Sequence, residues 1–112
     1  MAPEILLADR SQPMMPQVSD KTDVWAAGVV LYTLACAELP FKGTTQRQII
    51  EQMTADESVI LHVIAQNPYW LHLNPDLRSL IRQMLRKNPH DRLSSCQVLC
   101  HPWFVKARNL EL

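Results

Sequence analysis

The residues best suited to chemistry in this 112-residue chain are Cys96, Cys100 and His101, close to its C-terminal end. Thiolate and imidazole groups are common zinc ligands, and cysteines four positions apart share one face of a helix. A structural zinc site normally needs four ligands, and only His90 offers a fourth. We therefore predict no metal site and interpret the two cysteines as small hydrophobic residues buried in the core.

Charged residues form the next set of candidates. Asp23 opens a strongly apolar segment, where the positive end of a helix dipole would stabilise its carboxylate. Four cations lie opposite the apolar face of a later predicted helix: Arg78, Arg82, Arg86 and Lys87. This basic stripe could bind a partner or a lipid surface. We favour the simpler interpretation, a solvated helix face.

The composition excludes several classes of protein. The chain has only two glycines, Gly28 and Gly43, and they are far apart, whereas a phosphate-binding loop needs several glycines close together. Eleven basic residues balance eleven acidic ones, so no nucleic-acid partner is indicated. The longest apolar run is too short to span a bilayer. With three cysteines and no secretory or transmembrane signal, we expect a cytoplasmic or nuclear protein without a membrane partner.

The sequence predicts that these residues lie on helices separated by proline-containing loops. Residues 21–37 are apolar at almost every position, which is typical of a helix in the middle of a larger protein. Thr45 with Gln48 and Ser94 with Gln97 are capping-box patterns that open two short helices. Residues 56–66 have helical spacing. Asn74 followed by Pro75 opens the most clearly amphipathic segment, which we expect to stop at residues 88–89.

No strand alternation is evident, so the sequence predicts an all-α fold. The aromatic loop at 67–73 has two interpretations. Tyr69, Trp70 and Leu71 form an exposed docking patch, or they pack beneath a long loop. The residues alone leave both open.

Three short motifs, in this order, resemble the C-terminal lobe of eukaryotic Ser/Thr protein kinase domains. Residues 2–4 resemble the APE motif that ends the activation segment. Residues 23–28 (DVWAAG) resemble the opening of the central F helix. Residues 85–104 resemble the closing segment, which ends in HPWF. The residues that carry the resemblance are Ala2, Pro3, Glu4, Asp23, Trp25, Gly28 and Arg92.

The resemblance implies structural and substrate-floor roles for these residues. Glu4 would pair with Arg92 and tie the peptide-binding loop to the helical core, since a guanidinium meets a carboxylate through two hydrogen bonds. Asp23 would accept N–H bonds from the catalytic loop of a complete kinase. Gly28 would let the F helix pack closely against its neighbour, and Gly43 would close the turn that follows.

The sequence contains no H-R-D and no D-F-G string, and residues 90–92 (HDR) belong to the closing segment. Phosphoryl transfer by a kinase needs a glycine loop, a strand lysine, a metal-binding Asp and a catalytic Asp with its Asn. We therefore expect no catalytic, cofactor-binding or metal-binding residue in this chain. ATP and magnesium would bind only in a complete parent kinase.

We interpret residues 1–104 as a partial kinase domain, from the APE motif to HPWF, and residues 105–112 as a short tail. Met1 resembles an internal residue of the family, so we expect a fragment that lacks the N-lobe and the catalytic loop. The parent would transfer the γ-phosphate of ATP to Ser or Thr of protein substrates, and this chain alone would be inactive. The alternative is a non-catalytic module that binds protein substrates or kinase-associated proteins.

Overall fold

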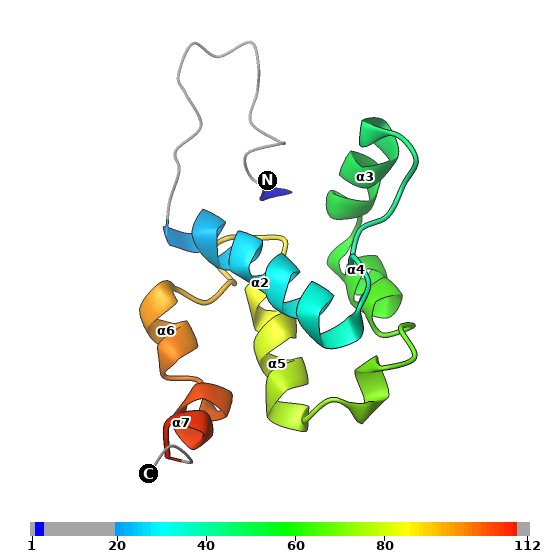
Figure 1. Cartoon of the computed structure of the whole chain (residues 1–112). Helices are drawn as coiled ribbons and strands as arrows, with labels where there is room; N and C mark the ends of the chain where they lie inside the picture. The colour runs from blue at the N-terminus through cyan, green and yellow to red at the C-terminus, as the bar shows by residue number, and fades with distance from the viewer. Residues whose placement is uncertain (1, 4–19, 110–112) are drawn as a thin grey trace, which may run out of the picture.

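The computed structural model describes residues 2–3 and 20–109, and the regular secondary structure within these ranges is all helical (Figure 1). This confirms the predicted all-α class. The α-helices and one short 3₁₀ helix, η1, follow one another in the order α2 (Asp20–Cys36), α3 (Gln46–Met53), α4 (Glu57–Ile64), η1 (Trp70–His72), α5 (Pro75–Met84), α6 (Ser95–Leu99) and α7 (Pro102–Asn109). No helix in the described ranges is both long and apolar enough to cross a membrane.

Helix α2 runs through the middle of the molecule, with α3 and α4 near one end and α6 and α7 near the other (Figure 1). Its bounds agree closely with the predicted segment 21–37. The helix ends because Ala37 adopts a left-handed conformation with φ of 57°, while its N–H still bonds to the carbonyl of Thr33. Glycine is the usual residue at such a helix end.

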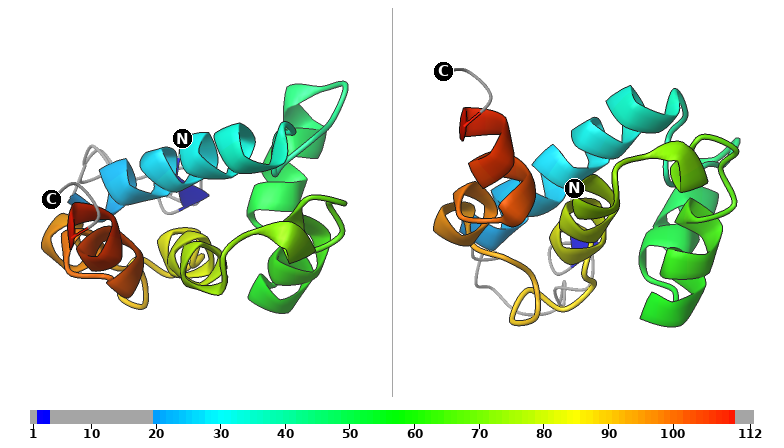
Figure 2. Two further views of the ribbon diagram at one scale, coloured as in Figure 1. Left: turned by 60° about the horizontal axis from the view of Figure 1, so that its bottom comes forward. Right: turned by 90° about the horizontal axis from the view of Figure 1, so that it is seen from below.

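Helix α5 packs against α2, as the views in Figure 2 also show. The contact depends on Gly28, because a Cβ atom at this position would lie 2.9 Å from Cβ of Met84 and 3.1 Å from Cδ2 of Leu85. The close approach of two helices inferred for Gly28 is therefore present. Gly43 has no positive φ; instead, a Cβ there would lie 2.7 Å from Cβ of Gln48, so it allows α3 to fold back closely on the turn.

Two hydrophobic clusters share this central pair of helices. The first joins α2 to α3, α4, η1 and α5, and it contains the buried residues Ala2, Trp25, Tyr32, Cys36, Phe41, Met53, Ile60, Ile64, Trp70, Ile81 and Leu85. The second joins α2 and α5 to α6 and the start of α7, and it contains Val24, Leu80, Met84 and Val98. Leu31 packs against both clusters, so α2 is the element that connects the two halves.

The predicted helix starts are confirmed where a side chain caps the backbone. Thr45 accepts the N–H of Gln48 at 3.2 Å, and Asn74 accepts the N–H of Asp76 at 2.8 Å. Ser94 and Gln97 form a complete capping box, with each side chain bonded to the other residue's backbone. Capping side chains satisfy N–H groups that have no partner inside the helix.

In the aromatic loop at 67–73, one of the three candidate residues is buried and two are exposed. Trp70 is buried, with its ring 5.8 Å from that of Tyr32 and the guanidinium of Arg82 at 6.0 Å from its centroid. Tyr69 and Leu71 are exposed. Only the tryptophan therefore packs under the loop, because the 3₁₀ turn directs neighbouring side chains to different sides.

Candidate functional site

Arg92 is the best-defined charged residue among the predicted site residues, since it is 1% exposed. Its Nε donates to the carbonyl of Arg86 at 2.9 Å, its Nη1 to that of Lys21 at 2.7 Å and its Nη2 to that of Lys87 at 3.2 Å. The guanidinium also lies 5.1 Å from the ring centroid of Trp25. Backbone oxygens and an aromatic face therefore hold the buried cation in one orientation.

Helix α5 ends earlier than predicted. The sequence indicated that Asn88 and Pro89 stop this helix, but α5 already ends at Met84. The carbonyls of Arg86 and Lys87 point to the guanidinium of Arg92 instead of continuing the helical ladder. The guanidinium of Arg92 thus satisfies two carbonyl groups that follow the end of the helix.

The start of α2 is tied to the same loop. Lys21 Nζ donates to the carbonyls of Pro89 at 3.0 Å and Arg92 at 2.6 Å. Asp20 accepts the N–H of Ser95 at 2.8 Å through Oδ2, and hydrogen bonds from the side chain and backbone of Ser95 lower the pKa of this carboxyl. The structure thus brings together segments about seventy residues apart in the chain.

The other predicted site residues differ in how deeply they are buried. Ala2 and Pro3 are buried, and Ala2 belongs to the same hydrophobic cluster as Trp25. Trp25 is fully buried and stacks on Phe41, with centroids 5.5 Å apart. Glu4 lies outside the described residues, so its predicted pairing with Arg92 stays a prediction.

Asp23 is exposed in the first turn of α2. Its neighbours include an open apolar cavity of about 290 Å³ between α2 and α6, lined by Val24, Ala27, Met84 and Val98 among others. The carboxylate lies at the N-terminal end of the helix, as the sequence predicted, where the helix dipole stabilises a negative charge.

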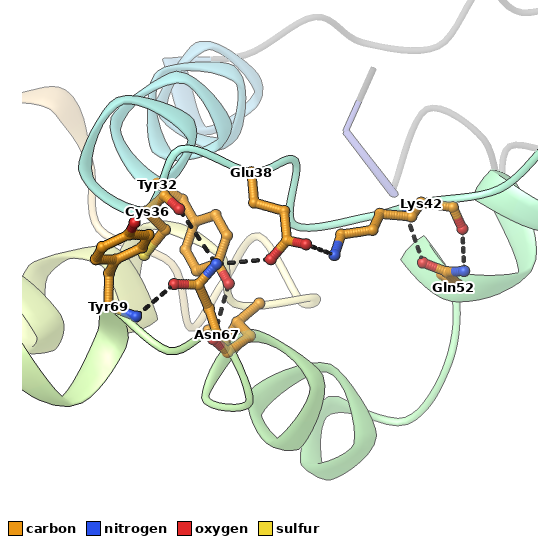
Figure 3. A network of polar contacts seen from close by, with 8 residues as sticks. Tyr32, Cys36, Glu38, Lys42, Gln52, Asn67 and Tyr69 are labelled. Atoms are coloured by element: carbon orange, nitrogen blue, oxygen red, sulfur yellow. Dashed lines mark hydrogen bonds and ion pairs between the residues drawn. The ribbon is translucent and has the colours of Figure 1, made fainter.

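A polar network that the sequence did not predict joins the end of α2 to the loop after α4 (Figure 3). The buried Asn67 donates through Nδ2 to the carbonyl of Cys36 at 3.2 Å and to Glu38 Oε2 at 2.6 Å, and its Oδ1 accepts the N–H of Tyr69 at 2.8 Å. Glu38 also pairs with Lys42. One amide thereby satisfies three polar groups at a buried helix end.

In and around this network, the pKa of Glu38 is lowered, whereas those of Tyr32 and Cys36 are raised. Hydrogen bonds from Lys42 and then Asn67 lower the pKa of Glu38. Burial raises the pKa of Tyr32, whose hydroxyl donates to the carbonyl of Ile64 at 2.8 Å, and it also raises the pKa of the Cys36 thiol. In the sequence, Asn67 showed only as a residue before proline, so its spacing gave no signal of these contacts.

The predicted burial of the C-terminal cysteines is wrong. Cys96 and Cys100 are exposed, whereas Cys36 is buried, and all three are free thiols. Helix α6 covers the core with Val98 only, so its other side faces solvent. Within residues 2–3 and 20–109, no group of three or more His, Cys, Asp or Glu side chains could hold a metal ion.

The basic stripe is not simply a solvated face. Arg86 pairs with Glu57 at 2.5 Å, and Lys87 Nζ donates to the carbonyl of Thr54 at 2.8 Å. Arg82 lies over Trp70. Arg82, Arg86 and Lys87 therefore connect α5 and the loop after it to η1, to α4 and to the end of α3.

The arrangement of helices and buried motif residues defines a known class of domain. The family model described as the protein kinase domain matches residues 1–104. The chain therefore belongs to the protein kinase domain family, and its helices form a C-lobe portion of a Ser/Thr kinase domain, as the motif order indicated.

Curated relatives include calcium-dependent protein kinase 25 of Arabidopsis thaliana, which is 37% identical over 93 residues, covering 79% of this chain and 17% of that protein. The rat Ser/Thr-protein kinase DCLK1 is 39% identical over 83 residues, covering 74% of this chain and 18% of the relative. This chain therefore spans less than a fifth of the length of either relative.

Solved structures give the same fold. The twitchin kinase region of C. elegans matches with a TM-score of 0.69 and 25% identity, covering 92% of this chain and 16% of that one. The Rad53 kinase domain with SCD2, in complex with AMPPNP, matches with a TM-score of 0.66 and 24% identity, covering 92% and 36%. The second likeness concerns the fold alone.

Proposed function

We propose that this chain is the scaffold portion of a Ser/Thr protein kinase whose complete form transfers the γ-phosphate of ATP to Ser or Thr of proteins, and that the 112-residue chain alone is inactive. The match of the protein kinase domain to residues 1–104 carries the proposal. Its sequence offers no candidate for the glycine loop, the strand lysine or the catalytic Asp. ATP and magnesium would bind to the complete kinase through residues that this chain does not contain.

A binding and transfer assay tests the inactivity of the chain. We expect no rise in melting temperature when ATP and magnesium are added, and no labelled phosphate on Ser- or Thr-containing peptides. The full catalytic domain of a related kinase serves as the positive control. Transfer by the purified 112-residue chain would contradict the proposal.

Within this function, we propose that Glu4 pairs with Arg92 and so fixes the floor of the peptide-binding site. Ala2 is buried in the cluster of Trp25, whose ring lies under the guanidinium of Arg92. Glu4 follows Ala2 by only two positions in the chain, which supports the pairing. A buried guanidinium is well accommodated where a carboxylate neutralises it.

A double-mutant cycle tests this pair, with Glu4→Gln, Arg92→Lys and the combined variant measured by urea unfolding. We expect the single losses of stability not to add, with a coupling of about 1–3 kcal/mol. Arg92→Lys keeps the positive charge but removes the guanidinium fork, so it tests the contribution of the paired hydrogen bonds. Additive losses, within about 0.5 kcal/mol, would contradict the pairing.

We propose that Asp23 accepts backbone N–H bonds from the catalytic loop of the complete kinase. Its exposure at the first turn of α2 supports this role, because the carboxylate is accessible to another segment. In a complete kinase, Asp23→Asn should lower activity, whereas the same change should leave the stability of the 112-residue chain within about 0.5 kcal/mol, since surface substitutions usually have small effects.

The second candidate function is a non-catalytic module that binds kinase substrates or kinase-associated proteins. It is favoured by an open apolar cavity of about 310 Å³ beside α2, lined by Trp25, Ala26, Val29, Leu39, Pro40, Phe41, Ile49 and Met53. Exposed apolar surface of this kind is typical of interaction sites. Saturable binding of the chain to a kinase domain, lost on Leu39→Ser, would support this function, and absence of binding would exclude it.

A further inference from the structure

Helix α6 places two thiols on one side of the molecule. Val98 is the buried residue of this helix, at 8% exposure, and it packs into the second hydrophobic cluster. Cys96 and Cys100 lie two residues before and two residues after Val98. With 3.6 residues per turn, each is turned by about 160° from Val98, and the two are only about 40° apart. They therefore share the face opposite the core.

The two thiols are exposed, free and one helical turn apart. The N–H of Cys100 bonds to the carbonyl of Cys96 at 3.2 Å, so the turn between them is helical. Side chains at this spacing have Cβ atoms about 5–6 Å apart. A disulfide needs Cβ atoms at about 3.5–4.5 Å, so the pair does not close on itself without distortion of the turn.

The neighbouring imidazole is not a third ligand of this pair. His101 is 7% exposed; its Nδ1 accepts the N–H of Trp103 at 3.1 Å, and its Nε2 lies 3.4 Å from Ser79 Oγ. Both ring nitrogens thus contact groups of the fold. The described residues hold no group of three metal-ligating side chains, so the pair offers two sulfur ligands and no more.

We propose that Cys96 and Cys100 form a two-thiolate site for a soft monovalent cation, Cu(I). Thiolates are soft ligands that select Cu(I), and two-coordinate geometry suits this ion, whereas zinc normally takes four ligands. On binding, two Cu–S bonds form, both thiol protons leave to solvent, and neither copper nor sulfur changes oxidation state. The two cysteines lie within the closing segment but are not among the residues that carry the family resemblance, and the site does not depend on the proposed function.

A competition titration of the reduced, full 112-residue chain with Cu(I), held by the chromophoric chelator bathocuproine disulfonate, tests the site. We expect one Cu(I) per chain. Cys96→Ser and Cys100→Ser should each weaken binding by more than about 100-fold, because changes even to groups that only orient a ligand cost about 10–100-fold. Cys36→Ala should leave the stoichiometry unchanged, since that thiol is buried.

A matched control keeps the number of thiols constant. The double variant Cys96→Ser with Leu99→Cys places the second thiol at an exposed neighbouring position, and adjacent side chains on a helix do not face each other. It should bind Cu(I) no better than Cys96→Ser alone. Equal affinity for the control and the natural chain would overturn the proposal. So would a copper-bridged dimer in size-exclusion chromatography, or equally tight binding of zinc.

Discussion

At the scale of single residues, Ala37 is held in a conformation that its side chain disfavours. Among the described residues it is the one non-glycine position with positive φ, at 57°. The left-handed region costs an L-residue with a Cβ about 1–2 kcal/mol. Glycine is the usual residue at a helix end of this conformation, and alanine occupies the position here.

Ala37→Gly should therefore stabilise the chain. The relief of strain exceeds the added flexibility of the unfolded glycine, which costs about 0.4–1 kcal/mol, so we expect a net gain of about 0.5–1 kcal/mol. Thermal unfolding should show this as a rise of several degrees. Ala26→Gly, inside α2, is the matched control and should instead lower stability by about 1 kcal/mol. A loss of stability in Ala37→Gly would show that the backbone at Ala37 is not strained.

Glu38 should make stability depend on pH. Its folded pKa lies below the unfolded value of 4.5, so its contribution is fully present above that value and is lost as the pH falls through the folded pKa. The melting temperatures of the natural chain and Glu38→Gln should therefore differ at neutral pH and converge in acid. Lys42→Met removes the main cause of the shift and should flatten this dependence. A difference that persists in strong acid would contradict the prediction.

At the scale of elements, the packing of α5 on α2 is set by the absence of a side chain at Gly28. The Cβ of an alanine would meet Met84 Cβ, which is fixed to the backbone of α5 and cannot rotate away. The two helices would have to separate. Because both hydrophobic clusters include residues of α2 and α5, the separation would loosen the whole core.

Gly28→Ala should destabilise the chain by about 1–2 kcal/mol. Overpacking costs about 1–3 kcal/mol, and the better helix propensity of alanine returns up to about 1 kcal/mol. Urea unfolding measures the change. Combining Gly28→Ala with Met84→Ala distinguishes steric conflict from other causes: the Cβ conflict remains, so the double variant should lose the further stability of a buried methionine. Recovery of stability in the double variant would contradict this account.

At the scale of the whole molecule, the described residues leave apolar surface open to solvent. Helix α2 keeps apolar side chains in solvent: Val30 and Leu34 are 57% and 78% exposed. A helix that is apolar all round is normally buried on all sides. The exposed residues mark the side of α2 that another part of a kinase, or another protein, would cover.

Val30→Ser with Leu34→Ser should reduce self-association of the purified chain without a large loss of stability. Exposed apolar surface drives association, and exposed substitutions usually change stability by no more than about 0.5 kcal/mol each. Light scattering over a concentration series measures the association, and thermal unfolding checks the fold. Leu80→Ser, at a buried position, is the contrasting variant and should unfold the chain. Unchanged association in the double variant would show that this face is not responsible.

The starts of three helices could be predicted from the sequence, because their signals are local. Thr45, Asn74 and Ser94 cap their helices as their spacing predicted, since a cap involves residues two or three positions apart. The sequence also identified Gly28 as a packing position and, through three ordered motifs, the family. Each of these depends on neighbours along the chain or on a recognisable string of residues.

Contacts between side chains far apart in the chain follow from the tertiary packing. Cys96 and Cys36 are the same residue type, yet one faces solvent and one is buried, because burial depends on what covers a helix face and not on the residue. Arg92 donates a hydrogen bond to the carbonyl of Lys21, which is 71 positions away in the chain. Asn67 joins helix ends about thirty residues apart in the chain. Such contacts form only after the chain has folded, so spacing along the sequence cannot encode them directly.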